Sequence, residues 1–388
     1  MRKIYIFIFT VLFSLNSFSQ NPDPQILEMI EETSLDSLTK YVRELSGEDS
    51  VVINGVKTII KTRWTPLEGL AADYLKQRIT EFGLSPIEQT VPGSMGPGDN
   101  ILATKKGNQD SSSYYIICAH YDSFTDYCAD DNASGCAAVL ESARILADYE
   151  FPYTIVFAFW NEEEMGLMGS MYYADSVRNE NGQILGVINL DMLGWDSDNN
   201  GEFDINVRNI ANSTDLSDKI IEVVEDYSLS LSPIVFNPGT IYSDHYSFWL
   251  NNYGALVFSE AMFSGDGNPY YHSVEDRIDK FNMPYFHELG KLSVGIIATL
   301  ASDYTVEIQE IDNQSINIYP NPASNYIYVQ TSYKTEIQIF DLFGRSVLST
   351  FVNKNNSIID ISSLNEGNFV IIAKSNLKYD IYKLIISR

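Results

Sequence analysis

Three runs of apolar residues predict strands that are buried on both faces. They cover residues 114–119, 153–159 and 187–190, and few polar side chains interrupt them. A strand with helices packed on both of its sides has this pattern, because neither face contacts water. Polar or acidic residues follow each run within two positions, so the carboxyl end of each predicted strand carries groups that can bind or react.

Apolar residues at helical spacing predict helices around these strands. Residues 136–149 and 284–300 predict one helix each, and residues 28–83 predict two helical runs that flank a loop. The second of these runs, residues 67–82, ends at Gly83, a residue type that commonly terminates helices. We therefore expect an α/β domain with a mixed, mostly parallel central sheet that is flanked by helices.

Past residue 312 the pattern changes to short alternating runs, which are typical of strands with one face in a core. These runs are residues 315–319, 326–330, 337–340, 369–373 and 379–386. Residues 313–388 carry seven Lys and Arg against five Asp and Glu, whereas the whole chain has a net charge of −27. The change predicts a boundary between a large domain, residues 20–312, and a small β-sandwich, residues 313–388.

The first nineteen residues predict a secretory signal peptide. Arg2 and Lys3 form a basic start, residues 4–15 are apolar, and Ser17 and Ser19 frame a small-x-small cleavage site. The apolar run is too short to span a membrane. We therefore expect export through the periplasm to the outside or the surface of the cell, and a mature chain without a transmembrane segment.

Composition narrows the classes of partner. The strong acidity argues against nucleic acids and anionic membrane surfaces, which bind basic proteins. A chain of 388 residues, 45% of them hydrophobic, can form one large domain and one small one. The three cysteines, Cys118, Cys128 and Cys136, allow at most one disulfide, and the sequence leaves open whether any forms.

Two adjacent acids, Glu163 and Glu164, follow the predicted strand at residues 153–159. Ligand sites in open α/β sheets lie at the carboxyl ends of strands. Two carboxylates repel each other there unless a cation offsets their charge, so the pair indicates a metal site. Other groups of suitable chemistry stand at a predicted strand end, in a loop or at a helix start: His120, Asp122, Asp131, Asp191 and His272.

Each of these residues alone is more often a helix cap, a turn residue or a structural histidine. Together they predict a metal centre, because imidazole and carboxylate groups suit zinc. They stand in the motifs His-Tyr-Asp (120–122), Asp-Asp-Asn-Ala-Ser-Gly (130–135), Glu-Glu-Met-Gly (163–166), Leu-Asp-Met (190–192) and Tyr-His-Ser (271–273). These ordered motifs resemble those of the co-catalytic zinc aminopeptidases, family 28 of the metallopeptidases, and the resemblance covers about residues 27–303.

The resemblance implies two zinc ions per chain and a role for each ligand. His120 and Asp191 would hold one zinc ion. Glu164 and His272 would hold the other, and Asp131 would bridge the two. Zinc lowers the pKa of bound water and polarises a carbonyl group, which is what amide hydrolysis near neutral pH requires.

The resemblance also implies catalytic roles for three residues that are not ligands. Glu163 would be the general base, which takes a proton from water and delivers it to the leaving amine. Asp122 would orient a histidine ligand, and Tyr271 would donate a hydrogen bond to the tetrahedral oxyanion. Residues 243–249 would line and support the site, and we interpret His245 as structural support rather than as a ligand.

The end of the chain has motifs of its own. Tyr-Pro-Asn-Pro-Ala at 319–323 and Ile-Phe-Asp-Leu-Phe-Gly-Arg at 339–345 resemble the type A C-terminal sorting domain of the type IX secretion system. The resemblance implies that the secretion machinery is a partner, and that the tail is removed or used for attachment. The alternative is an accessory domain that binds, for example, carbohydrate, but the sequence gives no aromatic platform in its favour.

These observations favour a secreted zinc aminopeptidase that acts on peptides. A glutaminyl cyclase of related fold, with one zinc ion, is the first alternative. A carboxypeptidase-like relative would need a cation for the substrate carboxylate, and Arg208 and Arg277 are the candidates near the motifs. A binding protein without activity is disfavoured because Glu163 and every ligand are present. The preferred N-terminal residue, the physiological metal, the oligomeric state and the fate of the tail stay open.

Overall fold

The computed structural model describes most of the chain. The described residues are 22–64, 66–93, 96–303, 316–331, 334–353, 355–375 and 378–388. The chain divides into two compact units, Met1–Thr305 and Val306–Arg388. The signal peptide predicted for residues 1–19 lies outside the described residues.

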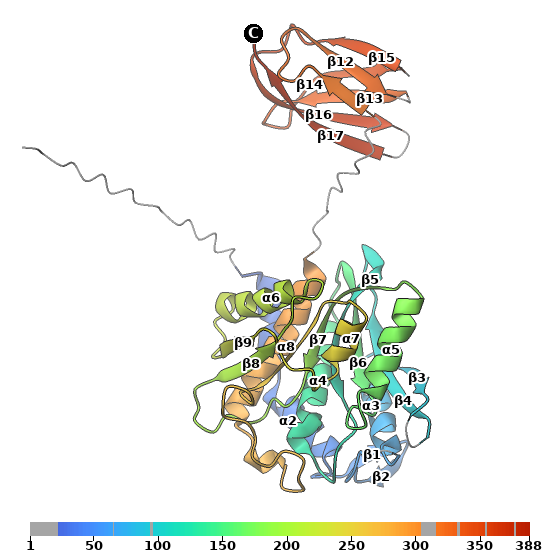
Figure 1. Ribbon diagram of the computed structural model, residues 1–388, viewed down its shortest axis with the longest axis vertical. Helices are drawn as coiled ribbons and strands as arrows, with labels where there is room; N and C mark the ends of the chain where they lie inside the picture. Colours follow the sequence, from blue (N-terminus) through green and yellow to red (C-terminus); the bar gives the residue numbers. More distant parts are fainter. Residues whose placement is uncertain are drawn as a thin grey trace, which may run out of the picture. The chain divides into compact units, whose positions relative to one another are not determined.

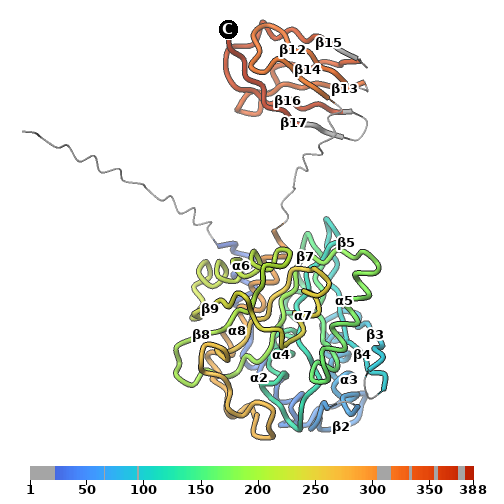
Figure 2. Tube along the Cα trace, in the orientation of Figure 1, coloured from blue at the N-terminus to red at the C-terminus, as the bar shows by residue number. Residues whose placement is uncertain are grey.

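The first unit is built on an eight-stranded sheet with the order β3-β4-β6-β5-β7-β10-β8-β9. Its strands are β3 Ile87–Val91, β4 Gly98–Lys105, β5 Asp110–His120, β6 Tyr153–Trp160, β7 Gln183–Leu190, β8 Glu202–Asn206, β9 Ser232–Phe236 and β10 Ala255–Glu260. The central strands β6, β5, β7 and β10 run parallel to one another. Figure 2 shows β3 and β4 at one edge of the sheet, and β8 and β9 at the other. The mixed, mostly parallel sheet expected from the sequence is confirmed.

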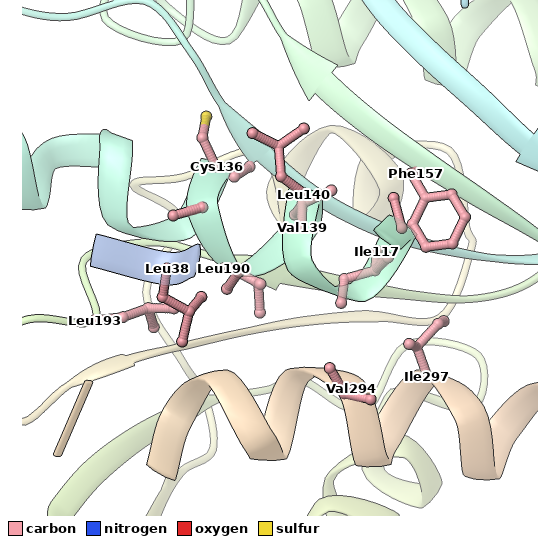
Figure 3. Close-up of a cluster of buried hydrophobic side chains, with 14 of the residues drawn as sticks. Leu38, Ile117, Cys136, Val139, Leu140, Phe157, Leu190, Leu193, Val294 and Ile297 are labelled. Carbon is pink, nitrogen blue, oxygen red and sulfur yellow. The ribbon is translucent and has the colours of Figure 1, made fainter. Parts of the chain in front are cut away.

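Helices cover both faces of this sheet (Figure 1). On one face lie α1 Pro24–Glu31, α2 Leu35–Leu45, α3 Gly69–Glu81, α4 Gly135–Leu146, α6 Ser213–Asp226 and α8 Met283–Ser302. On the other face lie α5 Met168–Asn179 and α7 His245–Leu250. Strand alternation produces the two layers, because Ile117 of β5 packs into the first core while Ile116 and Cys118 pack into the second. Figure 3 shows Ile117 facing Val294 and Ile297 of α8.

The helices predicted at residues 67–82, 136–149 and 284–300 correspond to α3, α4 and α8. The loop expected between the first helical runs contains a hairpin of β1 (Val51–Ile53) and β2 (Val56–Thr58). Periodicity misses it because each strand has only three residues. The Asn54-Gly55 turn, with φ of 51° and 79°, was the available signal.

The second unit is an antiparallel β domain with two sheets, ordered β11-β12-β15 and β14-β13-β16-β17. Its strands are β11 Ile316–Tyr319, β12 Tyr326–Thr331, β13 Thr335–Phe340, β14 Ser346–Val352, β15 Asn355–Asp360, β16 Gly367–Ser375 and β17 Lys378–Ile386. The unit has its own apolar core. Tyr319 stacks on Tyr328 with 5.5 Å between ring centroids, and both rings are exposed, so there is an aromatic row that the sequence pattern did not predict. Across the described residues, no helix is long and apolar enough to cross a membrane.

Candidate metal centre

Parallel neighbouring strands bring the first two ligand candidates together. His120 is the last residue of β5, Asp191 directly follows β7, and the two strands pair in parallel. The Nε2 atom of His120 lies 3.4 Å from Oδ1 of Asp191. The His120 side chain is only 2% exposed, so its ring is shielded from water. We call His120 and Asp191 the inner half of the site.

Asp131 lies between the inner half and a second pair of residues. Its Oδ1 atom is 3.3 Å from Nε2 of His120, and its Oδ2 atom is 3.2 Å from Nε2 of His272. The Asp276 carboxylate accepts hydrogen bonds from the backbone N–H groups of Asp130 and Asp131. The loop before α4 is thereby fixed, and the two oxygens of Asp131 face two different histidines.

His272 and Glu164 form the outer half of the site, where Nε2 of His272 is 3.1 Å from Oε2 of Glu164. The His272 side chain is 28% exposed. Its ring stacks on Tyr271, with 3.7 Å between the centroids, and on Phe124, with 4.1 Å between the centroids and an angle of 5° between the planes. Ring packing therefore supports this histidine.

Asp122 connects the inner half to the acidic pair after β6. Its Oδ1 atom lies 3.5 Å from Nδ1 of His120. Its two carboxylate oxygens accept hydrogen bonds of 3.1 Å from the backbone N–H groups of Glu163 and Glu164. A separation of 3.5 Å is the outer limit of a hydrogen bond, so the two backbone bonds are the stronger restraint.

Burial and crowding of acids shift the pKa values of the site. Burial raises the pKa of Glu163 well above its usual range, and the charges of Asp244 and Asp191 add to this. Burial and the charge of Asp131 raise the pKa of Glu164 to about 7. Burial also acts to raise the pKa of Asp131, but the two histidines outweigh it and the pKa falls below its usual range. A divalent cation would lower the pKa of every one of these acids, since it favours their charged forms.

The donor atoms fit a zinc site. One ligand atom each from His120, Asp131 and Glu164 lies within 4.8 Å of the others. Asp131 Oδ2 and Glu164 Oε1 are buried and make no hydrogen bond of acceptable geometry to the described residues. Such oxygens are costly to bury without a partner, and a cation that binds them removes this cost. Imidazole nitrogen and carboxylate oxygen are the donors that zinc prefers, together with thiolate.

A second group of carboxylates lacks these orphaned atoms. Asp196, Asp198 and Asp266 also have ligand atoms within 4.8 Å of one another. Their oxygens, however, accept hydrogen bonds from neighbouring amide and hydroxyl groups. Among the described residues, the first group is therefore the better candidate for a catalytic metal.

A cavity of about 270 Å³ adjoins the donor atoms, and Glu163 and Tyr271 line it together with the ligand candidates. Its apolar wall is formed by Met192, Val257, Met262 and Phe263. No Lys or Arg is among the described residues that line it. The cavity therefore combines an apolar wall with carboxylates, and the described part of its lining offers no cationic side chain.

The two arginines considered for a carboxypeptidase are engaged elsewhere. Arg208 donates to the carbonyl oxygen of Gly239. Arg277 forms an ion pair with Glu48 and stacks on Tyr127, with 3.6 Å between the guanidinium carbon and the ring centroid. Neither lines the cavity, so the geometry gives no support to this alternative.

The segment that contains His245 supports the site from behind. Ser243 Oγ donates to Asp191 Oδ2 and accepts a hydrogen bond of 2.7 Å from Asn189. His245 Nε2 donates to the carbonyl oxygen of Thr240 at 3.0 Å, and burial lowers the pKa of His245 to about 4. His245 is thus held as a neutral ring away from the donor atoms, as the sequence interpretation expected.

Sequence reasoning missed Phe124, Asp276 and Arg63. Arg63 is fully buried, and its guanidinium group donates to backbone carbonyl oxygens in three segments: Leu45, Tyr121, Tyr127, Cys128 and Asp131. It thereby ties the chain after His120 to the loop that carries Asp131. No local pattern marks these three residues, because each acts on a part of the chain that is distant in sequence. The three cysteines are buried free thiols, so no disulfide forms among them.

The fold and the donor set together define the class of α/β metallohydrolases. The chain belongs to peptidase family M28, whose model matches residues 100–297, and it is therefore a hydrolase. A secretion-system C-terminal sorting domain matches residues 317–387, which indicates a secreted or surface protein.

Relatives and solved structures agree with this assignment. A probable zinc metalloprotease of Pyrenophora teres f. teres is 30% identical over 51% of this chain and 47% of its own length. A probable leucine aminopeptidase of Trichophyton verrucosum is 28% identical over 71% of this chain and 75% of its own. The chain spans about half the length of the zinc metalloprotease relatives it matches.

Two solved structures share the fold. The LapA aminopeptidase of Legionella pneumophila aligns with a TM-score of 0.61 at 22% identity, over 72% of this chain and 75% of that one. A glutaminyl cyclase of Bacteroides thetaiotaomicron aligns with a TM-score of 0.55 at 19% identity, over 69% of this chain and 98% of that one. At these identities the likeness concerns the fold alone.

Proposed function

We propose that this chain is a secreted aminopeptidase that removes single N-terminal residues from peptides with the help of two zinc ions. The observation that carries the proposal is the cavity beside the donor atoms, whose lining, within the described part of the chain, holds acids and apolar side chains and no Lys or Arg. Two zinc ions would offset the charge of the lining carboxylates, so beyond the metals the described lining gives a terminal carboxylate no cationic side chain to pair with, and the apolar wall is left for the side chain of an N-terminal residue. The relative described as a leucine aminopeptidase supports the same reading.

In this proposal His120 and Asp191 would hold one zinc ion, and Glu164 and His272 would hold the other. Asp131 would serve both ions, since its two oxygens lie 3.3 and 3.2 Å from different histidines. Bound zinc supplies an acidified water and a polarised carbonyl group. The protein supplies the fixed spacing of the donors.

Glu163 is the general base of the proposed reaction. It lines the cavity next to the donor atoms, takes the proton from the attacking water and passes it to the leaving amine. Tyr271 also lines the cavity. Burial raises the pKa of Tyr271, so its hydroxyl stays protonated and can donate a hydrogen bond to the oxyanion. Asp122 holds the backbone of Glu163 and contacts one histidine ligand.

The apolar wall gives the preferred substrate. Met192, Val257, Met262 and Phe263 would enclose the side chain of the N-terminal residue. An apolar side chain such as Leu or Met gains from this burial, and a charged one loses its hydration. We therefore expect peptides with an apolar N-terminal residue to be the best substrates.

A glutaminyl cyclase is the second candidate, because cyclase structures share the fold. That enzyme class needs one metal ion, whereas the donor atoms here form two facing pairs around Asp131. Peptides with N-terminal glutamine distinguish the two, since a cyclase closes the glutamine ring and an aminopeptidase releases free glutamine.

The test is hydrolysis of aminoacyl and N-blocked anilides by the purified protein, with its zinc content measured alongside. We expect cleavage of the free-amine substrates only, two zinc ions per chain, loss of activity on chelation and recovery with zinc. Cleavage of N-blocked substrates would refute the exopeptidase assignment. One zinc ion per chain, with conversion of N-terminal glutamine to pyroglutamate, would favour the cyclase.

A further inference from the structure

Three large apolar side chains close in the chain to the candidate site are exposed and do not line the cavity. Trp64 is 46% exposed, Leu67 57% and Phe124 51%. Single exposed apolar residues are common and need no explanation. These three residues are brought together by backbone contacts, and one of them, Phe124, stacks on the ligand candidate His272. We call them the outer strip.

Backbone contacts hold the outer strip together. The chain that carries Trp64 runs beside the chain that carries Phe124, because the N–H of Arg63 donates to Ser123 Oγ and the N–H of Ser123 donates to the Arg63 carbonyl oxygen. The side chains of Arg63 and Ser123 point inward and are buried. The residues that follow them, Trp64 and Phe124, are exposed. Leu67 joins them through a turn in which its N–H donates to the Trp64 carbonyl oxygen.

The ring of His272 separates the outer strip from the cavity. Tyr271 and Phe124 both stack on it, with centroid distances of 3.7 and 4.1 Å and interplanar angles of 21° and 5°. Two rings this close and this parallel cannot share one face of an imidazole, so they lie on opposite faces. Tyr271 lines the cavity and Phe124 does not.

This partition matches the two sides of a scissile bond. The bond must lie at the donor atoms, and in the function proposed above the N-terminal side chain enters the cavity. The next residue of the peptide then leaves the site on the other side of His272, where Phe124 begins the outer strip. We propose that the outer strip binds apolar side chains of the substrate that follow the scissile bond. This inference rests on the proposed aminopeptidase function and adds a preference for apolar residues at the second and third positions of the peptide.

The test compares two tripeptides that share their N-terminal residue, Leu-Phe-Gly and Leu-Gly-Gly. We expect kcat/KM to favour Leu-Phe-Gly by roughly tenfold, because one aromatic side chain gains an apolar contact. Trp64→Ser should reduce this ratio to about two, and Trp64→Phe should retain most of it. Ile87→Ser removes a comparably exposed apolar side chain in the edge strand β3, and it should leave the ratio unchanged.

Two further measurements keep the test decisive. Leu67→Ser gives an independent variant if Trp64→Ser fails to fold. Inhibition by N-acetyl-Phe-Gly, compared with N-acetyl-Gly-Gly, reports binding to the outer strip without turnover because neither has a free α-amine, and Trp64→Ser should weaken inhibition by N-acetyl-Phe-Gly selectively. A wild-type ratio near one, or an equal loss for both peptides in the variants, would overturn the inference. Release of no leucine from either peptide would instead refute the proposed function.

Discussion

The two halves of the candidate metal centre are held by different means. His120 of the inner half is 2% exposed and has Asp122 beside its second nitrogen, and its partner Asp191 accepts a hydrogen bond from Ser243. His272 of the outer half is 28% exposed and stands between two aromatic rings. Hydrogen bonds to residues at the end of the sheet fix the orientation of a ligand side chain. Ring stacking fixes only the plane of the His272 ring and lets the ring move within that plane. The outer half is therefore held less rigidly, and its histidine is the more exposed of the two.

Removal of the proposed general base, Glu163, should abolish most of the activity and leave both halves of the candidate metal centre intact. Glu163→Gln should lower kcat by about a thousandfold, because the proton of the attacking water then lacks an acceptor. The zinc content should stay that of the wild type, because Glu163 is not a ligand in the proposed site. Anilide hydrolysis and metal analysis check this, with Glu180→Gln on the surface as the control. Unchanged kcat would remove Glu163 from the mechanism.

Acid should weaken the support of the inner half. Burial lowers the pKa of His245 from 6.5 to about 4, and the charge of Arg208 adds to this. The His245 ring takes up a proton near pH 6.5 in the unfolded chain and only near pH 4 in the folded chain. The contribution of the neutral His245 ring to the free energy of unfolding is therefore complete above pH 6.5, and it is lost as the pH falls towards 4. The loss amounts to about 3 kcal/mol at pH 4.

Urea unfolding between pH 7.5 and 4.5 measures this loss. His245→Gln should flatten the dependence of the unfolding free energy on pH, because its side chain does not titrate. His287→Gln on α8, at the opposite face of the sheet, should keep the wild-type dependence. An identical slope for the wild type and His245→Gln would contradict the assignment.

Asp122 provides a sharper test of the hydrogen-bonded half. Asp122→Ala removes the acceptor for two backbone N–H groups and the neighbour of His120. Residues that orient metal ligands typically contribute about 10- to 100-fold to metal affinity, so we expect a loss of that size. Competition with a zinc chelator measures the affinity, and Asp218→Ala on the surface of α6 is the control. A chelator curve that matches the wild type would show that Asp122 does not support the metal.

Phe124 tests the stacked half, where we expect the smallest effect. Phe124→Leu removes the ring that covers His272 but keeps an apolar side chain. One of two zinc equivalents should then dissociate roughly threefold to tenfold faster, since an aromatic contact contributes about 1 kcal/mol. Phe124→Tyr should restore the wild-type rate. If both equivalents were lost faster to the same degree, the two halves would not be independent.

The parts that the sequence predicted are those with local causes. The apolar run at residues 153–159 marks β6, and the acids behind it mark a strand end, because burial and the polar stop act on neighbouring residues. β5 begins at Asp110, earlier than predicted. Its first residues are polar, so the apolar pattern did not mark them, but backbone pairing with β6 does not depend on polarity. Phe124 carried no signal, since a lone aromatic residue in a loop gains meaning only when the fold brings His272 against it.

The first part of the chain contains no ligand candidate, but the buried guanidinium group of Arg63 makes it part of the support of the candidate metal centre. The family match begins at residue 100, beyond this arginine, which binds the backbone around both His120 and Asp131. A shortened protein that kept every ligand candidate but began at that border would lose this crosslink. The structural unit that positions the ligand candidates is thus larger than the segment that carries them.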